Sequence, residues 1–153
     1  MDGGLLQRPH SDWWRARYAS LSPHDWERLL NHADERLRLG LLHNPYAPRA
    51  AVEALAWQEL FRDGNVTRVL IEVASSRLVS ADVLREVASW RVWEVWAVLL
   101  HNPNLPDDVL GHIAQWDHGD AMLRREYQYL RSRAKEILAE RAKVVKKEVG
   151  RAP

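Results

Sequence analysis

Short apolar stretches at helical spacing alternate along this chain with turns that contain proline. The helix that follows Ser22-Pro23 carries Trp26, Leu29 and Leu30 on one face. Ser22 can cap the free amides of that helix, and Pro23 fits its first position, where a missing N–H costs nothing. Ordered structure is expected to begin near Asp12, a candidate N-cap. The pattern therefore predicts a series of short helices.

One turn occurs twice, as the segments Leu41-Leu42-His43-Asn44-Pro45-Tyr46-Ala47-Pro48 and, 58 residues later, Leu99-Leu100-His101-Asn102-Pro103-Asn104-Leu105-Pro106. The Asn-Pro step is expected to end a helix, because the residue before a proline is pushed out of the α region. The second proline is expected to start the next helix. The structural turn residues are Asn44, Pro45, Pro48, Asn102, Pro103 and Pro106.

The match at this offset continues beyond the turn, and each half of the chain divides again. Four units are predicted, near residues 17–42, 43–74, 75–100 and 101–120, in a repeat domain spanning 12–120 that follows a flexible tail, 1–11. The first and third units lack Asn-Pro and show Tyr18-Ala19 and Ser76-Arg77 in its place. Helical repeats of this length are typical of solenoids, in which each unit buries its apolar face against its neighbours.

The segments His43 to Pro48 and His101 to Ala114 resemble the leucine-rich repeat variant, a bacterial repeat that runs Asn-Pro, a spacer, Pro, and then Leu and Leu-Ala. This resemblance covers roughly residues 17–120. It implies short α and 3₁₀ helices that alternate and stack into a right-handed superhelix without β-sheet. It implies no catalytic activity, because the family has none in common. The expected fold is an all-α, right-handed α-solenoid of about four units with a long C-terminal helix.

Residues 121–149 are expected to form that long helix, with Asp120 as its cap, Gly150 as its stop and 150–153 as a tail. Its first half is expected to cap the last unit. Its second half is polar apart from three valines, and we expect it to project, to dimerise or to dock on a partner.

Charge is divided unevenly along the chain, although the net charge is only +1. Residues from Arg124 onward carry +6, and the preceding residues carry −5. A solvated helix explains the basic tail most simply, and binding to an acidic partner or to nucleic acid is the alternative. The acidic body argues against nucleic acid, since it would repel phosphates. The candidate nucleic-acid contacts are Arg124, Arg125, Arg131, Arg133, Lys135, Arg141, Lys143, Lys146 and Lys147.

Eight tryptophans are several times the ordinary number for 153 residues. Trp90, Trp93 and Trp96 fall in a predicted helix, 90–100, that is apolar nearly all round, so they are expected in the core. The other tryptophans are less constrained, and tryptophan beside arginine is common at interface hot spots. The predicted partner contacts are Trp13, Trp14, Arg15, Trp57 and Arg62.

Catalytic and metal chemistry find little support in the sequence. Cysteine is absent, which excludes thiol catalysis and Cys-ligated zinc or iron–sulfur clusters. His43 and His101 lie beside Asn-Pro, where an imidazole can meet the last helical carbonyls. The one cluster of metal-ligand types lacks any known zinc spacing. That cluster contains His112, Asp117, His118 and Asp120.

The chain contains neither a glycine-rich phosphate loop nor a Gly-x-Ser-x-Gly elbow. We therefore expect no catalytic residues, no metal and no cofactor. The predicted function is a non-enzymatic binding or scaffold module that recognises a protein partner, with nucleic-acid binding by the C-terminal helix as the alternative. A cytoplasmic protein that is not bound to a membrane is expected, because neither a secretory signal nor an apolar run of membrane-spanning length is present.

Overall fold

The computed structural model describes residues 11–62, 66–117 and 123–151, and within them it contains helices and no strands. This confirms the all-helical prediction. Of the predicted N-terminal tail only Ser11 is among these residues, and Asp120, the expected cap of the last helix, lies outside them. The helices are α2 (Asp12–Tyr18), α3 (Pro23–Leu30), α4 (Glu35–Gly40), the 3₁₀ helix η2 (Leu41–His43), α5 (Arg49–Leu60), α6 (Val66–Ser75), α7 (Ala81–Ser89), α8 (Trp93–Leu99), α9 (Asp107–Gln115) and α10 (Arg124–Arg151).

Helix starts follow the local capping chemistry. Ser22 caps α3 as expected, since its hydroxyl accepts a hydrogen bond from the Asp25 amide (3.1 Å) and Pro23 is the first helical residue. The prediction that Asp12 caps α2 is wrong. Ser11 is the cap, because its hydroxyl accepts from the Trp14 amide (3.3 Å), and Asp12 is the first helical residue.

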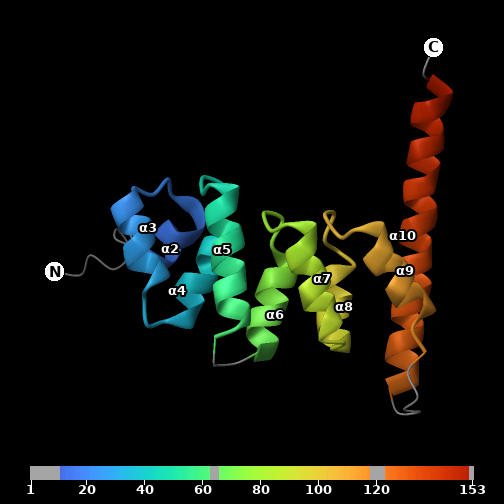
Figure 1. Ribbon diagram of the computed structural model, residues 1–153, viewed down its shortest axis with the longest axis horizontal. Helices are drawn as coiled ribbons and strands as arrows, with labels where there is room; N and C mark the ends of the chain where they lie inside the picture. Colours follow the sequence, from blue (N-terminus) through green and yellow to red (C-terminus); the bar gives the residue numbers. More distant parts are fainter. Residues whose placement is uncertain (1–10, 63–65, 118–122, 152–153) are drawn as a thin grey trace.

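Figure 1 shows the helices following one another along the long axis in chain order, from α2–α4 at one end to α9 at the other. Contacts between neighbours hold this row together: α2 packs on α4, α5 on α6, α6 on α8 and α9 on α10. A single cluster of buried side chains runs from Ala16 in α2 to Ile137 in α10. The core is therefore elongated and shared by successive helices.

Asn44 and Asn102, the asparagines of the repeated turn, are buried and make equivalent hydrogen bonds. The Asn44 side-chain amide donates to the carbonyl oxygens of Ala16 and Ala19 (both 2.9 Å). Asn102 donates in the same way to two carbonyls that lie 28 and 26 residues before it, at 2.7 and 2.8 Å. The side-chain oxygen of each asparagine accepts the amide two residues ahead (2.9 Å). Each asparagine thus ties its own turn to an earlier helix end.

Ser76 occupies the corresponding position in the third predicted unit, where Asn-Pro is missing. Its side chain is fully buried, and its hydroxyl donates to the Leu42 carbonyl oxygen (2.6 Å). The same hydroxyl accepts the amide of Leu78, two residues ahead (3.2 Å). A serine therefore makes both kinds of bond that the asparagines make. We call Asn44, Ser76 and Asn102 the slot residues.

The tryptophan-rich stretch forms a shorter helix than predicted, because α8 begins at Trp93 rather than at residue 90. Trp96 is fully buried, as expected, and Trp93 is partly buried. The expectation is wrong for Trp90, which is 42% exposed in the turn between α7 and α8. Arg91 makes this turn by adopting a left-handed conformation (φ 56°), which ends α7 as a glycine normally would.

The C-terminal helix α10 crosses the end of the row and extends beyond the body (Figure 1). Tyr127, Leu130, Ala134 and Ile137 are buried in the shared core, so the first half of α10 covers α9. Gly150 lies within the helix, so the prediction that it ends the helix is wrong. Residues 142–150, here called the projecting segment, are exposed throughout. None of the helices in the described ranges has both the length and the apolar character needed to span a bilayer.

Candidate protein-interaction surface

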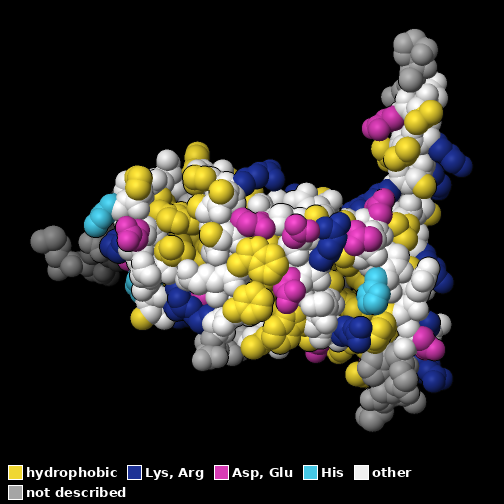
Figure 2. Space-filling view, viewed as in Figure 1, with side chains coloured by type: hydrophobic (Ala, Val, Ile, Leu, Met, Phe, Trp, Pro, Cys, Tyr) yellow, Lys and Arg dark blue, Asp and Glu magenta, His cyan; other side chains and the backbone are white. Residues whose placement is uncertain are grey.

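An apolar groove of about 520 Å³ lies between α3 and the start of α5. Figure 2 shows hydrophobic side chains gathered over these two helices. The groove is lined by one face of α3, by the turn that follows Asn44 and by the first turn of α5; the apolar lining includes Leu21, Trp26, Leu30, Tyr46, Ala47 and Ala51. A concave apolar surface with a few polar groups at its edge is typical of a binding site.

The local sequence explains why α3 presents apolar side chains outward. Trp26 and Leu30 are four residues apart and therefore share a face, whereas Leu29 points to the core and is fully buried. On the opposite wall, the bonds made by Asn44 hold the turn that carries Tyr46, a side chain that is 65% exposed. Both walls are thus built on backbone that is fixed by caps and buried hydrogen bonds.

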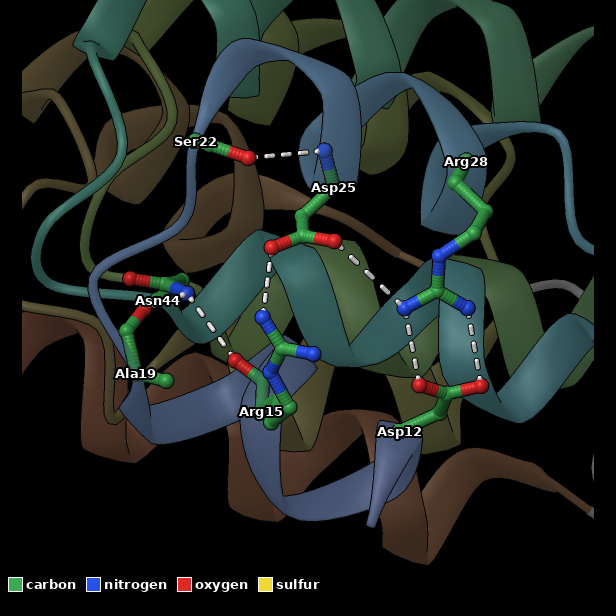
Figure 3. A network of polar contacts seen from close by, with 7 residues as sticks. All are labelled: Asp12, Arg15, Ala19, Ser22, Asp25, Arg28 and Asn44. Carbon is green, nitrogen blue, oxygen red and sulfur yellow. Dashed lines mark hydrogen bonds and ion pairs between the residues drawn. The ribbon is translucent and has the colours of Figure 1, made fainter. Parts of the chain in front are cut away.

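A polar network fastens α3 to α2 (Figure 3). Arg28 forms a two-pronged ion pair with Asp12 (3.0 and 2.9 Å), and the Arg28 hydrogen bond lowers the pKa of the Asp12 carboxyl below its usual value. Arg15 donates to Asp25 (2.5 Å), and Arg28 lies 3.8 Å from the same carboxylate. The network holds the α3 wall in place.

The predicted partner contacts on α2 differ in their exposure and in their contacts within the chain. Trp13 is 52% exposed, lies edge-on to Tyr18 (ring centroids 6.4 Å apart) and carries the Arg17 guanidinium over its ring at 5.7 Å. Trp14 is partly buried and packs against the same tyrosine. Arg15 faces Asp25. Of the three predicted residues, Trp13 therefore offers the most surface to a partner.

The predicted contacts at the end of α5 lie on a second surface. Trp57 is partly buried, donates through Nε1 to Glu53 (3.1 Å) and stacks on Phe61 with ring centroids 6.1 Å apart. Phe61, which the sequence analysis did not single out, is 69% exposed. The Arg62 guanidinium pairs with the buried Glu59 carboxylate (2.9 Å). Phe61 is thus the most exposed aromatic side chain of this surface.

Arg38 and Glu59 form a buried ion pair that sequence reasoning missed. Arg38 also donates to the carbonyl oxygens of His32 (2.6 Å) and Ala33 (3.1 Å), so its charge is enclosed by acceptors. The two residues lie 21 positions apart on different helices, and no sequence motif connects them. The pair joins α4 to α5 and lines no described pocket.

Two of the nine basic residues predicted for nucleic-acid binding are used within the chain. Arg141 bonds Asp107 (2.8 Å) and the Leu105 carbonyl oxygen (2.6 Å), and Arg133 pairs with Glu136 (3.0 Å). The other seven form no ion pair with any described residue. Those seven are Arg124, Arg125, Arg131, Lys135, Lys143, Lys146 and Lys147.

The described histidines have different surroundings, and His43 bonds a carboxylate rather than the last helical carbonyls that the sequence predicts. His43 donates through Nε2 to the Glu72 carboxylate (2.8 Å), and this bond lowers the pKa of Glu72 below its usual value. His101 is exposed, and His112 packs beside Trp96 and Trp116. The cluster suggested by sequence cannot be followed further, since His118 and Asp120 lie outside the described residues. Within the described ranges, no three His, Asp or Glu side chains are arranged to hold a metal ion.

Searches of protein-family models, curated proteins and solved structures find no match to this chain.

Proposed function

We propose that this chain is a non-enzymatic binding or scaffold module, a right-handed α-solenoid of the leucine-rich repeat variant type, that recognises a protein partner through the groove between α3 and α5. The solenoid assignment is supported by the slot residues, which make the same two kinds of bond at three successive turns, and by helices that follow one another in chain order (Figure 1).

The groove is the observation that carries this proposal. Its lining is mainly apolar, Trp26 and Tyr46 stand on its two walls, and its polar side chains are Glu27, Asn31 and Asn44. The Asn44 amide already donates to Ala16 and Ala19, so that group serves the fold. Because this lining holds no nucleophile beside a base, the groove is better suited to binding a partner than to catalysis.

The groove is also suited to binding because its walls are held before any partner arrives. The ion pairs of Figure 3 fix α3, and the Asn44 bonds fix the opposite turn. A preformed site loses little conformational entropy on binding, and aromatic anchors commonly supply most of the affinity of an interface. Trp13 lies on α2, the helix fastened to α3, and can extend the contact surface.

Photo-crosslinking from the groove tests this proposal. Tyr46 is replaced by a photoreactive benzoyl-phenylalanine, and the full chain is irradiated in an extract of its source. Tyr129 is the matched control, because it is a tyrosine of similar exposure (68%) on α10, away from the groove. A protein that crosslinks at position 46 and not at position 129 supports the proposal. Equal labelling from both positions, or none from position 46, contradicts it.

A further inference from the structure

The projecting segment of α10 exposes apolar side chains that the rest of the chain does not cover. Val144, Val145 and Val149 are 55%, 57% and 69% exposed. Valine and glycine are poor helix formers, so propensity alone gives this end of the helix little stability in water. Ala142, Val145 and Val149 recur at spacings of three and four residues and therefore form one stripe along the helix. A stripe of this kind is typical of a helix that packs on a partner.

The charge of the projecting segment limits what that partner is. Residues 142–150 contain three lysines, Lys143, Lys146 and Lys147, against one glutamate. Two such segments repel each other, which disfavours pairing between the tails of two copies. The residues that precede α10 carry a net charge of −5, so the segment and the body attract. A surface that combines apolar and acidic groups fits the segment better than a row of phosphates, because phosphates leave the valines uncovered.

The groove between α3 and α5 has these properties. It is apolar, and Glu27 stands on its α3 wall with an exposed carboxylate that pairs with no cation among the described residues. The C-terminal end of α3, where the helix dipole favours cations, borders the same groove at Leu30 and Asn31. α3 and α10 lie at opposite ends of the molecule in Figure 1, so α10 cannot reach the groove of its own chain.

We propose that the projecting segment of one copy docks in the α3–α5 groove of a second copy, with Val145 and Val149 on the apolar lining and Lys146 beside Glu27. This inference rests on the proposed function, because it names an occupant for the same groove. The contact joins two different surfaces, so a pair of copies keeps one free tail, on one copy, and one free groove, on the other. Association therefore continues into short chains or closes into a ring, of which a reciprocal dimer is the smallest.

Sedimentation velocity of the full chain, over about a hundredfold range of concentration, tests this inference. The mean mass is expected to rise with concentration and to fall as added salt screens the charges. Lys146→Glu and Glu27→Lys are each expected to weaken association by about tenfold or more. The matched control is Lys135→Glu, which reverses an exposed lysine on the covered half of α10 and is expected to associate as the unchanged chain does.

Charge exchange and the valine stripe give two further readouts. A mixture of Glu27→Lys and Lys146→Glu chains is expected to associate, since every junction between the two variants joins opposite charges. Val145→Ser is expected to weaken association, whereas Val144→Ser, a similarly exposed neighbour on another face, changes it little. A mixture that stays monomeric, or two serine variants that behave alike, overturns the proposed docking.

The remaining outcomes separate this inference from the proposed function. If the chain without substitutions stays monomeric over the whole concentration range, the inference is overturned. In that case a different protein crosslinked at position 46 still supports the groove as a binding site. A monomer that binds a labelled DNA duplex, with binding weakened by Lys146→Glu, assigns the segment to nucleic acid and overturns the inference as well. If the chain neither self-associates nor crosslinks to any protein at position 46, both the inference and the proposed function of the groove are overturned.

Discussion

The Ser76 hydroxyl donates a hydrogen bond of 2.6 Å to the carbonyl oxygen of Leu42, 34 residues earlier in the chain. Asn44 and Asn102 bond earlier carbonyls in the same way. The hydroxyl has one proton where an amide has two, so Ser76 reaches one carbonyl and each asparagine reaches at least two. The three residues connect segments about 25 to 34 residues apart in sequence through buried polar bonds.

Asn102→Ala is expected to lower the free energy of unfolding by about 2–3 kcal/mol, because it leaves the buried carbonyls of Ala74 and Ser76 without their donor. Urea denaturation measures the loss. Asn104→Ala is the control, since that exposed amide donates to a single carbonyl, and it is expected to cost no more than about 0.5 kcal/mol. Equal losses of stability in the two variants would contradict a special contribution of the Asn102 hydrogen bonds.

Trp96→Phe is expected to destabilise the chain by about 1–3 kcal/mol. The substitution removes the Nε1 donor to the Ala88 carbonyl (2.9 Å) and part of a ring that packs edge-on against Trp116 and Tyr127. Thermal unfolding measures the change. Trp90→Phe, at an exposed tryptophan six residues away, is expected to change the unfolding midpoint little.

Arg38→Met is expected to cost about 3–5 kcal/mol, because it leaves the buried Glu59 carboxylate without its main cation. The double variant Arg38→Met/Glu59→Leu is expected to recover part of this loss, since it removes both charges from the interior. Denaturation of the two single variants and the double variant forms a thermodynamic cycle. A double variant whose loss equals the sum of the single losses would rule out coupling between the pair.

Glu72→Gln is expected to reduce stability at neutral pH by about 0.5–1 kcal/mol. His43 lowers the pKa of Glu72 through its hydrogen bond, with Arg17 and Arg68 adding to the effect. A depressed carboxyl pKa stabilises the fold above the pKa of the unfolded chain, and that stabilisation is lost as the pH falls through the lowered value. Unfolding measured from pH 7 downward should therefore show the difference between the two chains shrinking under acid conditions.

A chain that ends at residue 123 is expected to aggregate, because it uncovers the apolar side chains of α9 that the first half of α10 buries. A chain that ends at residue 141 keeps those contacts and the Arg141 bonds, so it is expected to stay soluble with an unchanged unfolding midpoint. Size-exclusion chromatography and thermal unfolding compare the two. A soluble, stable shorter chain would contradict a capping role for α10.

Local chemistry and internal repetition made much of the helix order predictable. The start of α3 at Ser22-Pro23 and the equivalence of Asn44 and Asn102 follow directly from residue type and offset. The equivalence of Ser76 to these asparagines does not follow from residue type, because a serine in place of Asn-Pro departs from the repeated pattern. The hydrogen bonds of Ser76 show that hydrogen-bonding capacity is what this position retains.

The groove could not be found in the same way. Leu29 and Leu30 are identical neighbours in sequence, yet Leu29 is buried and Leu30 lines the groove. Which leucine faces outward depends on how α5 packs beside α3, and that is tertiary information. Similarly, the exposure of Phe61 and its stacking on Trp57 depend on the packing of α5 and could not be predicted from the sequence.

The slot bonds have a consequence for how such a chain changes in length. Each slot residue donates to a main-chain oxygen near the end of an earlier helix, and main-chain oxygens are present whatever the side chains are. A further segment of this kind, inserted by gene duplication, would carry its own slot side chain as the donor. A main-chain oxygen of the preceding segment would already be present as the acceptor. Lengthening the row of helices in this way therefore requires no matched pair of mutations at the new junction.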